Sequence, residues 1–269
     1  MKIALVQVAS PPEESPGARR SRVAEMVAAA RGSDLVVLPE LWAVGYFAFD
    51  SYAEQAETPA GPTVTAGREW ARELGAHVHL GSIVERDSRG ALFNTAVLIA
   101  PDGAIVHTYR KVHVFGYASR EAELLTPGDA LEVADTAFGP LAATTCYDLR
   151  FPELWRDLVD RGAKSVIVPA AWPAARREHW RLLTACRAIE EQVLLIACNA
   201  VGVQAGGVEL GGHSRVVDPW GNVLAEAGTE EGLTFCETDP AMVDTVRAEF
   251  PVLADRRWPM PSPEQAMRK

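Results

Sequence analysis

The stretch AATTCYDLRFPELW, residues 142–155, contains the transition that decides the fold. Its small and β-branched residues are typical of a buried strand, which reaches Cys146. A helix is expected next, because Pro152 suits a first helical turn and Gly162 suits the position after a helix end. In α/β proteins, binding and catalytic groups gather at the carboxyl ends of strands. The stretch therefore predicts an α/β fold in which Cys146 is a candidate nucleophile.

Strands and helices alternate in the same way along the rest of the chain. Apolar runs of strand length are typical of buried parallel strands, whereas apolar residues at helical spacing mark the helices. The first half predicts strands at 2–9, 34–40, 77–86, 92–100 and 104–115, and helices at 18–31 and 63–76. The second half predicts strands at 139–148, 164–171, 193–200 and 232–240, helices at 152–162 and 175–192, and a hairpin at 213–228.

Each half of the chain predicts one mixed sheet with helices on one face. Because two such sheets each have an apolar face to bury, they are expected to pack together as a four-layer αββα sandwich of two mixed β-sheets. Residues 1–269 are expected to form a single domain. The tail, about residues 252–269, has too many prolines for a helix, and we expect it to pack on the surface or on a partner subunit.

Composition and charge exclude several classes of protein. The 269-residue chain has a net charge of −10, whereas a nucleic-acid partner needs a basic surface. No apolar run reaches the roughly 18 residues that span a bilayer, so no membrane partner is expected. The N-terminal MKIALVQVAS is too short for a signal peptide. Four widely spaced cysteines without a CxxC pattern indicate reduced thiols and a cytoplasmic protein.

Three reactive side chains follow three of the expected strands. Glu40 comes after DLVVLP, Lys111 stands near the end of the strand at 104–115, and Cys146 follows AATT. Taken singly, each has an ordinary explanation: a glutamate in a loop, a surface lysine beside Arg110, and a small cysteine in the core. Their coincidence at strand ends favours one shared site.

A carboxylate, an ammonium and a thiol can together cleave an amide or a nitrile. The ammonium and a helix N-terminus would favour the thiolate of Cys146, and Glu40 would take its proton as general base. Lys111 and the backbone N–H of Tyr147 would hold the developing oxyanion. Glu40 would then protonate the leaving amine and activate the water that hydrolyses the thioester.

Three segments resemble the signature segments of the nitrilase-like carbon–nitrogen hydrolases: LPELW around Glu40, YRKVHVF around Lys111 and CYDLRFPEL around Cys146. Flanking segments such as FNTAVLIAPDG and GHSRVVDPWGNVLAEAG extend the resemblance over nearly the whole chain. The resemblance implies the αββα sandwich, subunits paired through helices into a dimer, and no metal or organic cofactor. It also implies a second glutamate that positions the lysine and the substrate. By spacing from the TPG segment this is Glu121 rather than Glu123.

Within that family, CYDLRFPEL, GHSRVVDPWG and AGTEEG resemble the omega-amidases. These enzymes hydrolyse the terminal amide of a 2-oxo acid, such as 2-oxoglutaramate, to the acid and ammonia. The alternatives are a deaminated-glutathione amidase, another aliphatic amidase or a nitrilase, and a non-catalytic member that serves as a scaffold. The chain departs from the family pattern at Glu191 and over residues 115–123, FGYASREAE, near the expected pocket mouth.

A small amide that carries a carboxylate needs a cation or a hydroxyl in its pocket. Five further residues are therefore candidates for substrate binding: Tyr46, His113, Arg150, Trp172 and Arg176. Several have a structural explanation too, since Arg150 could pair with Asp148 and His113 could make a core hydrogen bond. The pair His77 and His79 has no third ligand at a sensible spacing, so no metal site is predicted.

Overall fold

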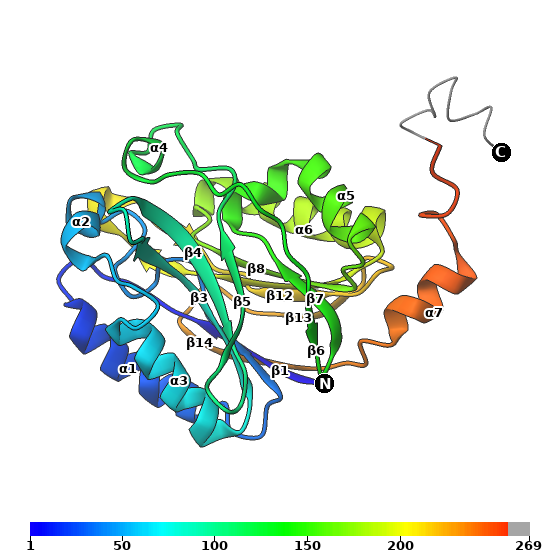
Figure 1. The fold of residues 1–269 in the computed structure, drawn as a ribbon, viewed down its shortest axis with the longest axis horizontal. Helices are drawn as coiled ribbons and strands as arrows, with labels where there is room; N and C mark the ends of the chain where they lie inside the picture. The colour runs from blue at the N-terminus through cyan, green and yellow to red at the C-terminus, as the bar shows by residue number, and fades with distance from the viewer. Residues whose placement is uncertain (258–269) are drawn as a thin grey trace.

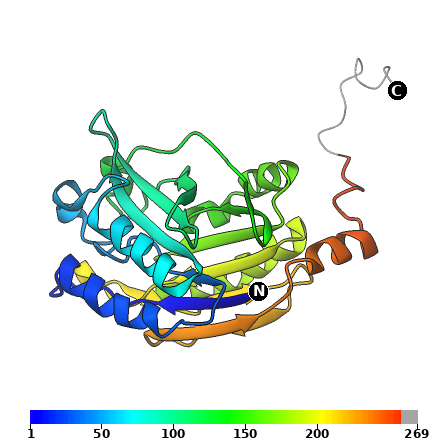
Figure 2. The same cartoon turned by 60° about the horizontal axis from the view of Figure 1, so that its bottom comes forward.

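Two mixed β-sheets stacked face to face form the centre of the molecule (Figure 1, Figure 2). The computed structural model describes residues 1–257 of the chain. In spatial order the first sheet contains β14 (Gly232–Glu237), β1 (Lys2–Gln7), β2 (Leu35–Val37), β3 (His77–Arg86), β4 (Leu92–Ile99) and β5 (Ile105–Arg110). The second sheet contains β13 (Val223–Glu226), β12 (Arg215–Val217), β9 (Leu194–Asn199), β8 (Ser165–Ala170), β7 (Gly139–Ala143) and β6 (Ala134–Thr136).

Helices cover the outer face of each sheet, which gives four layers. The first sheet is covered by α1 (Pro16–Ala28) and α3 (Pro62–Leu74), and the second by α5 (Pro152–Asp160) and α6 (Arg177–Glu191) (Figure 1). A further apolar core lies between the sheets and includes Leu5 of β1 and Ile167 of β8, both fully buried. The predicted α/β fold with two mixed sheets is confirmed.

The parallel strands of both sheets end at one edge of the sandwich. Strands β1, β2 and β3 are parallel, as are β7, β8 and β9. Backbone hydrogen bonds join the two sets across the sheets: Glu40 N–H donates to Ala170 O at 3.4 Å, and Val201 N–H donates to Val8 O at 3.1 Å. Groups placed after these strands therefore gather in one region, as is general for sites in α/β proteins.

The structure differs from the sequence-based expectation at several boundaries. β5 ends at Arg110 and β7 ends at Ala143, so Lys111 and Cys146 lie beyond their strands, because strand pairing ends where the chain turns into the site. Strand β14 comes from the second half but pairs with β1 in the first sheet, so the two halves do not form separate sheets. Helix α7 (Met242–Glu249) is not predicted from the sequence, since it is only two turns long.

Four shorter elements lie near the strand ends: α2 (Tyr52–Gln55), α4 (Glu121–Leu124), β10 (Val201–Val203) and β11 (Glu209–Gly211). The proline-rich tail expected at about residues 252–269 lies for its greater part outside the described residues. At its beginning, Arg256 forms an ion pair with Asp160 of α5. This first part of the tail therefore contacts the surface of its own chain.

Candidate active site

Glu40 lies in the turn after β2, and a close approach of two backbone segments supports this turn. Strand β3 has a bulge at Gly81, which has a φ of 69°. A Cβ atom there would lie 1.8 Å from the carbonyl oxygen of Pro39, so only glycine allows this approach. The Glu40 side chain is fully buried, and its Oε2 accepts the Ala171 N–H at 2.9 Å.

Cys146 lies in a sharp turn between β7 and α5. Its φ is 47°, in the left-handed region that non-glycine residues rarely adopt. A residue held there costs about 1–3 kcal/mol, and such residues cluster at functional sites. Cys146 also begins a 3-10 helix, Cys146–Arg150. The turn thus places the sulfur at the edge of the sheet, where it lines the pocket.

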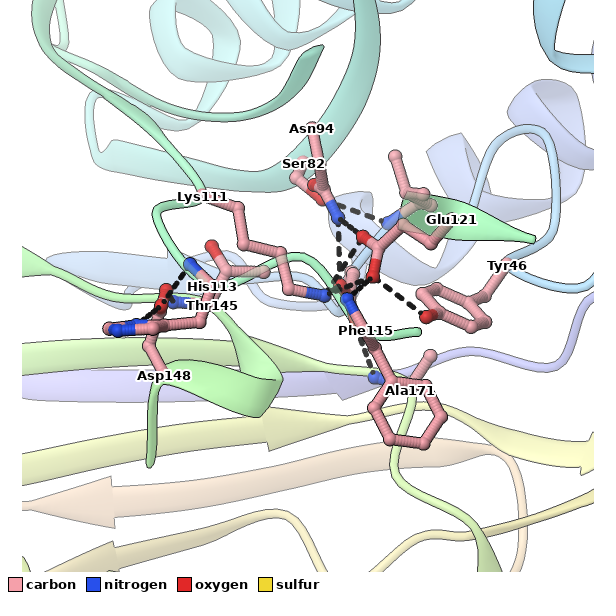
Figure 3. A network of polar contacts seen from close by, with 12 residues as sticks. Tyr46, Ser82, Asn94, Lys111, His113, Phe115, Glu121, Thr145, Asp148 and Ala171 are labelled. Carbon is pink, nitrogen blue, oxygen red and sulfur yellow. Dashed lines mark hydrogen bonds and ion pairs between the residues drawn. The ribbon is translucent and has the colours of Figure 1, made fainter. Parts of the chain in front are cut away.

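Asp148 joins this turn to the segment that carries Lys111. Its buried carboxylate accepts the Thr145 N–H at 3.0 Å and the Tyr109 hydroxyl at 2.7 Å. It also accepts the backbone N–H of His113 at 2.9 Å and lies 2.8 Å from His113 Nδ1 (Figure 3). One carboxylate therefore fixes the two segments relative to each other.

Lys111 lies between two buried carboxylates. Its Nζ donates to Glu40 Oε1 at 2.8 Å. It also donates to both oxygens of Glu121 at 2.9 Å (Figure 3). The Asn94 side chain connects the same pair, with Nδ2 2.8 Å from Glu40 Oε1 and 3.0 Å from Glu121 Oε1. The structure thus brings Glu40, Lys111 and Glu121 into one solvent-free cluster.

Of the two candidate second glutamates, Glu121 is the one that reaches the cluster. It begins α4, is fully buried, and accepts the Tyr46 hydroxyl at 2.9 Å and the Phe115 N–H at 2.7 Å. The Glu123 side chain is 71% exposed and lies 3.7 Å from Arg120 at the surface. Residues two apart on a helical turn point in different directions, so Glu123 points to the solvent when Glu121 points into the cluster.

Burial and the neighbouring charges together shift the pKa values of Glu40, Lys111 and Cys146. Burial raises the pKa of Glu40, and Lys111 offsets part of this effect. Burial alone would lower the pKa of Lys111, but the charges of Glu121 and Glu40 outweigh it and raise that pKa well above its ordinary value. Burial and the charge of Glu40 raise the pKa of Cys146 well above its ordinary value. These directions do not favour the expected thiolate; they favour a protonated sulfur next to the Glu40 carboxyl group.

Cys146 opens into a pocket of aromatic, small and basic residues: Tyr46, Phe47, Phe115, Tyr147, Arg150, Ala171, Trp172, Pro173 and Arg176. Four of the five sequence candidates for substrate binding, Tyr46, Arg150, Trp172 and Arg176, thus line it. His113 does not line it, because the ring is held by Asp148 and stacks on Phe151 with centroids 3.6 Å apart.

Two residues of the site, Asn94 and Asp148, are missed by the sequence-based candidates. Asn94 is the one amide in a strand that is apolar except for Asn94 and Thr95, which is a signal for a buried hydrogen-bonding role. Asp148 ends a T-x-x-D pattern of the type that begins helices. Each signal is common in proteins, so neither marks an active site before the fold is known.

Among residues 1–257, no three His, Cys, Asp or Glu side chains are grouped so that they could hold a metal ion. In the same range no helix has the length and apolar character to cross a membrane. Cys186, Cys198 and Cys236 are free cysteines.

The chain belongs to the carbon–nitrogen hydrolase family, whose model matches residues 2–248. It is an enzyme that acts on carbon–nitrogen bonds other than peptide bonds. Among its relatives, a 2-oxoglutaramate amidase of Paenarthrobacter nicotinovorans is 38% identical over 264 residues, covering 96% of this chain and 90% of that protein. An omega-amidase of Homo sapiens is 32% identical over 263 residues and 95% of each chain.

Solved structures agree with this assignment. A Saccharomyces cerevisiae member of branch 10 of the nitrilase superfamily has a TM-score of 0.87 at 32% identity, over 96% of this chain and 97% of that chain. An amidase of Nesterenkonia sp. AN1 has a TM-score of 0.80 at 29% identity, over 93% and 98%. That structure shows addition of acrylamide at its active-site cysteine. The expected relationship to the nitrilase-like hydrolases is confirmed.

Proposed function

We propose that this enzyme is an omega-amidase, which hydrolyses the terminal amide of a small 2-oxo acid such as 2-oxoglutaramate to the acid and ammonia. One observation about the pocket supports the proposed substrate class. Arg150 and Arg176 line the same pocket as Cys146, and within residues 1–257 neither forms an ion pair with a carboxylate. Guanidinium groups that lack a counter-ion suit the carboxylate of a substrate. The names of the 2-oxoglutaramate amidase and omega-amidase relatives support the same class.

The first half of the reaction forms a thioester. Because the resting sulfur is a thiol, Glu40 takes its proton as the sulfur attacks the amide carbon. The carbonyl oxygen becomes an oxyanion, which the Lys111 ammonium and the Tyr147 N–H stabilise. Glu40 then gives the proton to the departing nitrogen, and ammonia leaves as the carbon–nitrogen bond breaks. The acyl group stays on Cys146.

The second half releases the acid. Glu40 takes a proton from a water molecule, whose oxygen attacks the thioester carbon, and the same groups hold the second oxyanion. The carbon–sulfur bond breaks and the proton returns to the sulfur, which restores the resting enzyme. Glu121 keeps Lys111 in place by accepting from its Nζ through both oxygens, and Asn94 keeps Glu40 in place by donating to Glu40 and to Glu121.

A homodimer and a cytoplasmic location are part of the same proposal. Leu182 and Ile189 lie seven residues apart on one face of α6, with 69% and 49% of their surface exposed. Trp220 and Phe250 stack on each other, also exposed, and Gly221 lies against Ile189. An apolar area of this kind on an outer helix supports pairing of two copies. A single hydrolase domain over residues 1–269 stays a prediction.

Ammonia release from a substrate panel tests the proposal. The panel contains 2-oxoglutaramate, 2-oxosuccinamate, deaminated glutathione, glutamine and a simple nitrile, with Cys146→Ala as control. We expect the highest kcat/KM for the two 2-oxo acid amides and no turnover above background for the variant. Preference for deaminated glutathione or for the nitrile would replace the proposed substrate, and equal turnover by the variant would remove Cys146 as nucleophile.

A further inference from the structure

The two pocket arginines are held by aromatic rings instead of by carboxylates. Arg150 Cζ lies 4.6 Å from the ring centroid of Trp172, and Arg176 Cζ lies 5.7 Å from that of Phe115. Aromatic faces attract a cation without neutralising it. Burial and then the positive charge of Arg176 lower the pKa of Arg150. Arg150 Nη2 also lies 3.3 Å from His179 Nδ1. Neither aromatic contact links the two arginines to each other.

Trp172 contacts both arginine segments. Its ring supports the guanidinium group of Arg150, and its Nε1 donates to the carbonyl oxygen of Arg176 at 2.8 Å. Arg176 ends the 3-10 turn Ala174–Arg176 just before α6, so this hydrogen bond determines where its side chain leaves the backbone. One side chain thus links the guanidinium group of Arg150 to the backbone of Arg176.

The backbone of Trp172 is itself anchored at the end of β9. Asn199 Oδ1 accepts the Trp172 N–H at 2.7 Å, and Asn199 Nδ2 donates to the Trp172 carbonyl at 3.3 Å. The preceding residue, Ala171, donates its N–H to Glu40 at 2.9 Å. Trp172 is therefore held rigidly between the acid–base cluster and the two arginines.

We infer that Trp172 is the positioning residue that gives the pocket its specificity for acidic amides, because it fixes both guanidinium groups relative to Cys146. The inference rests on the proposed function, since it requires a substrate whose carboxylate those groups bind. Binding a planar carboxylate through guanidinium groups depends on their orientation as well as on their charge.

The substitution Trp172→Phe tests this role, because it keeps a ring below Arg150 and removes the N–H donor to Arg176. The measured quantity is the ratio of kcat/KM for 2-oxoglutaramate to kcat/KM for its neutral methyl ester. We expect this ratio to fall about tenfold, mainly through a higher KM for the acid. Trp42→Phe is the matched control: its Nε1 also donates to a backbone carbonyl, that of Leu80 at 2.9 Å, but its ring lies in the core of the first sheet and does not line the pocket.

The outcomes separate the inference from the proposed function. A wild-type ratio in Trp172→Phe, or an equal fall in Trp42→Phe, would overturn the role of Trp172. Equal hydrolysis of acid and ester by the wild-type enzyme would instead overturn the acidic substrate class. Thermal unfolding checks that each variant folds. Trp172→Tyr, which also lacks the indole N–H, takes the place of a phenylalanine variant that does not fold.

Discussion

Acidification is expected to destabilise the fold through His79. The imidazole is fully buried in β3, and neither ring nitrogen has a hydrogen-bond partner within the described chain. Burial, with a smaller contribution from His107, lowers the pKa of His79 from 6.5 to about 3. The folded protein therefore holds this side chain neutral over a pH range in which the unfolded chain protonates it.

The size of the effect follows from proton linkage. Because the pKa is lower in the folded state, the unfolded chain binds more protons, and stability falls as the pH drops below about 6.5. The difference between 6.5 and about 3 corresponds to about 5 kcal/mol once the pH is below both values. Between pH 7.5 and pH 5.0 the same relation gives a loss of about 2 kcal/mol.

Urea denaturation at pH 7.5 and pH 5.0 measures this loss. His79→Leu removes the titrating group. Between the two pH values, the free energy of unfolding of this variant should therefore fall by about 2 kcal/mol less than that of the wild type. Leu98→Met is the matched control, since Leu98 pairs with His79 in register on β4 and the change alters packing without removing a titrating group. An identical pH dependence in wild type and His79→Leu would refute the reasoning.

Three further predictions concern the site and the proposed dimer. Glu121→Gln should lower kcat at least about a hundredfold, because it weakens the hold on Lys111, whereas Glu123→Gln should stay within about twofold; steady-state kinetics of both variants tests this contrast. Alkylation of Cys146 by iodoacetamide, followed by mass spectrometry, should keep accelerating above pH 9, since burial and Glu40 raise the pKa of the thiol; a plateau near neutral pH would contradict the assignment. Leu182→Glu should shift the protein from dimer to monomer in analytical ultracentrifugation, because it places a charge in the exposed apolar area of α6; an unchanged sedimentation coefficient would place the subunit contact elsewhere.

The order of strands and helices and the α/β class could be predicted because each depends on local patterns. Apolar runs and helical periodicity record which face of an element is buried, and proline or glycine marks its ends. The positions of Glu40, Lys111 and Cys146 near strand ends are equally local. The sequence alone therefore predicts that these residues form one site.

Tertiary packing decided what depends on partners distant in the sequence. The choice of Glu121 over Glu123 depends on which side of one short turn faces Lys111, and Asn94 acquires its role only when β4 lies beside the turn after β2. The protonation of Cys146 depends on burial, which sequence spacing does not measure. Strand β14 pairs with β1 in the first sheet. Any two strands can form backbone hydrogen bonds, so the packing of the whole chain selects the partner of β14.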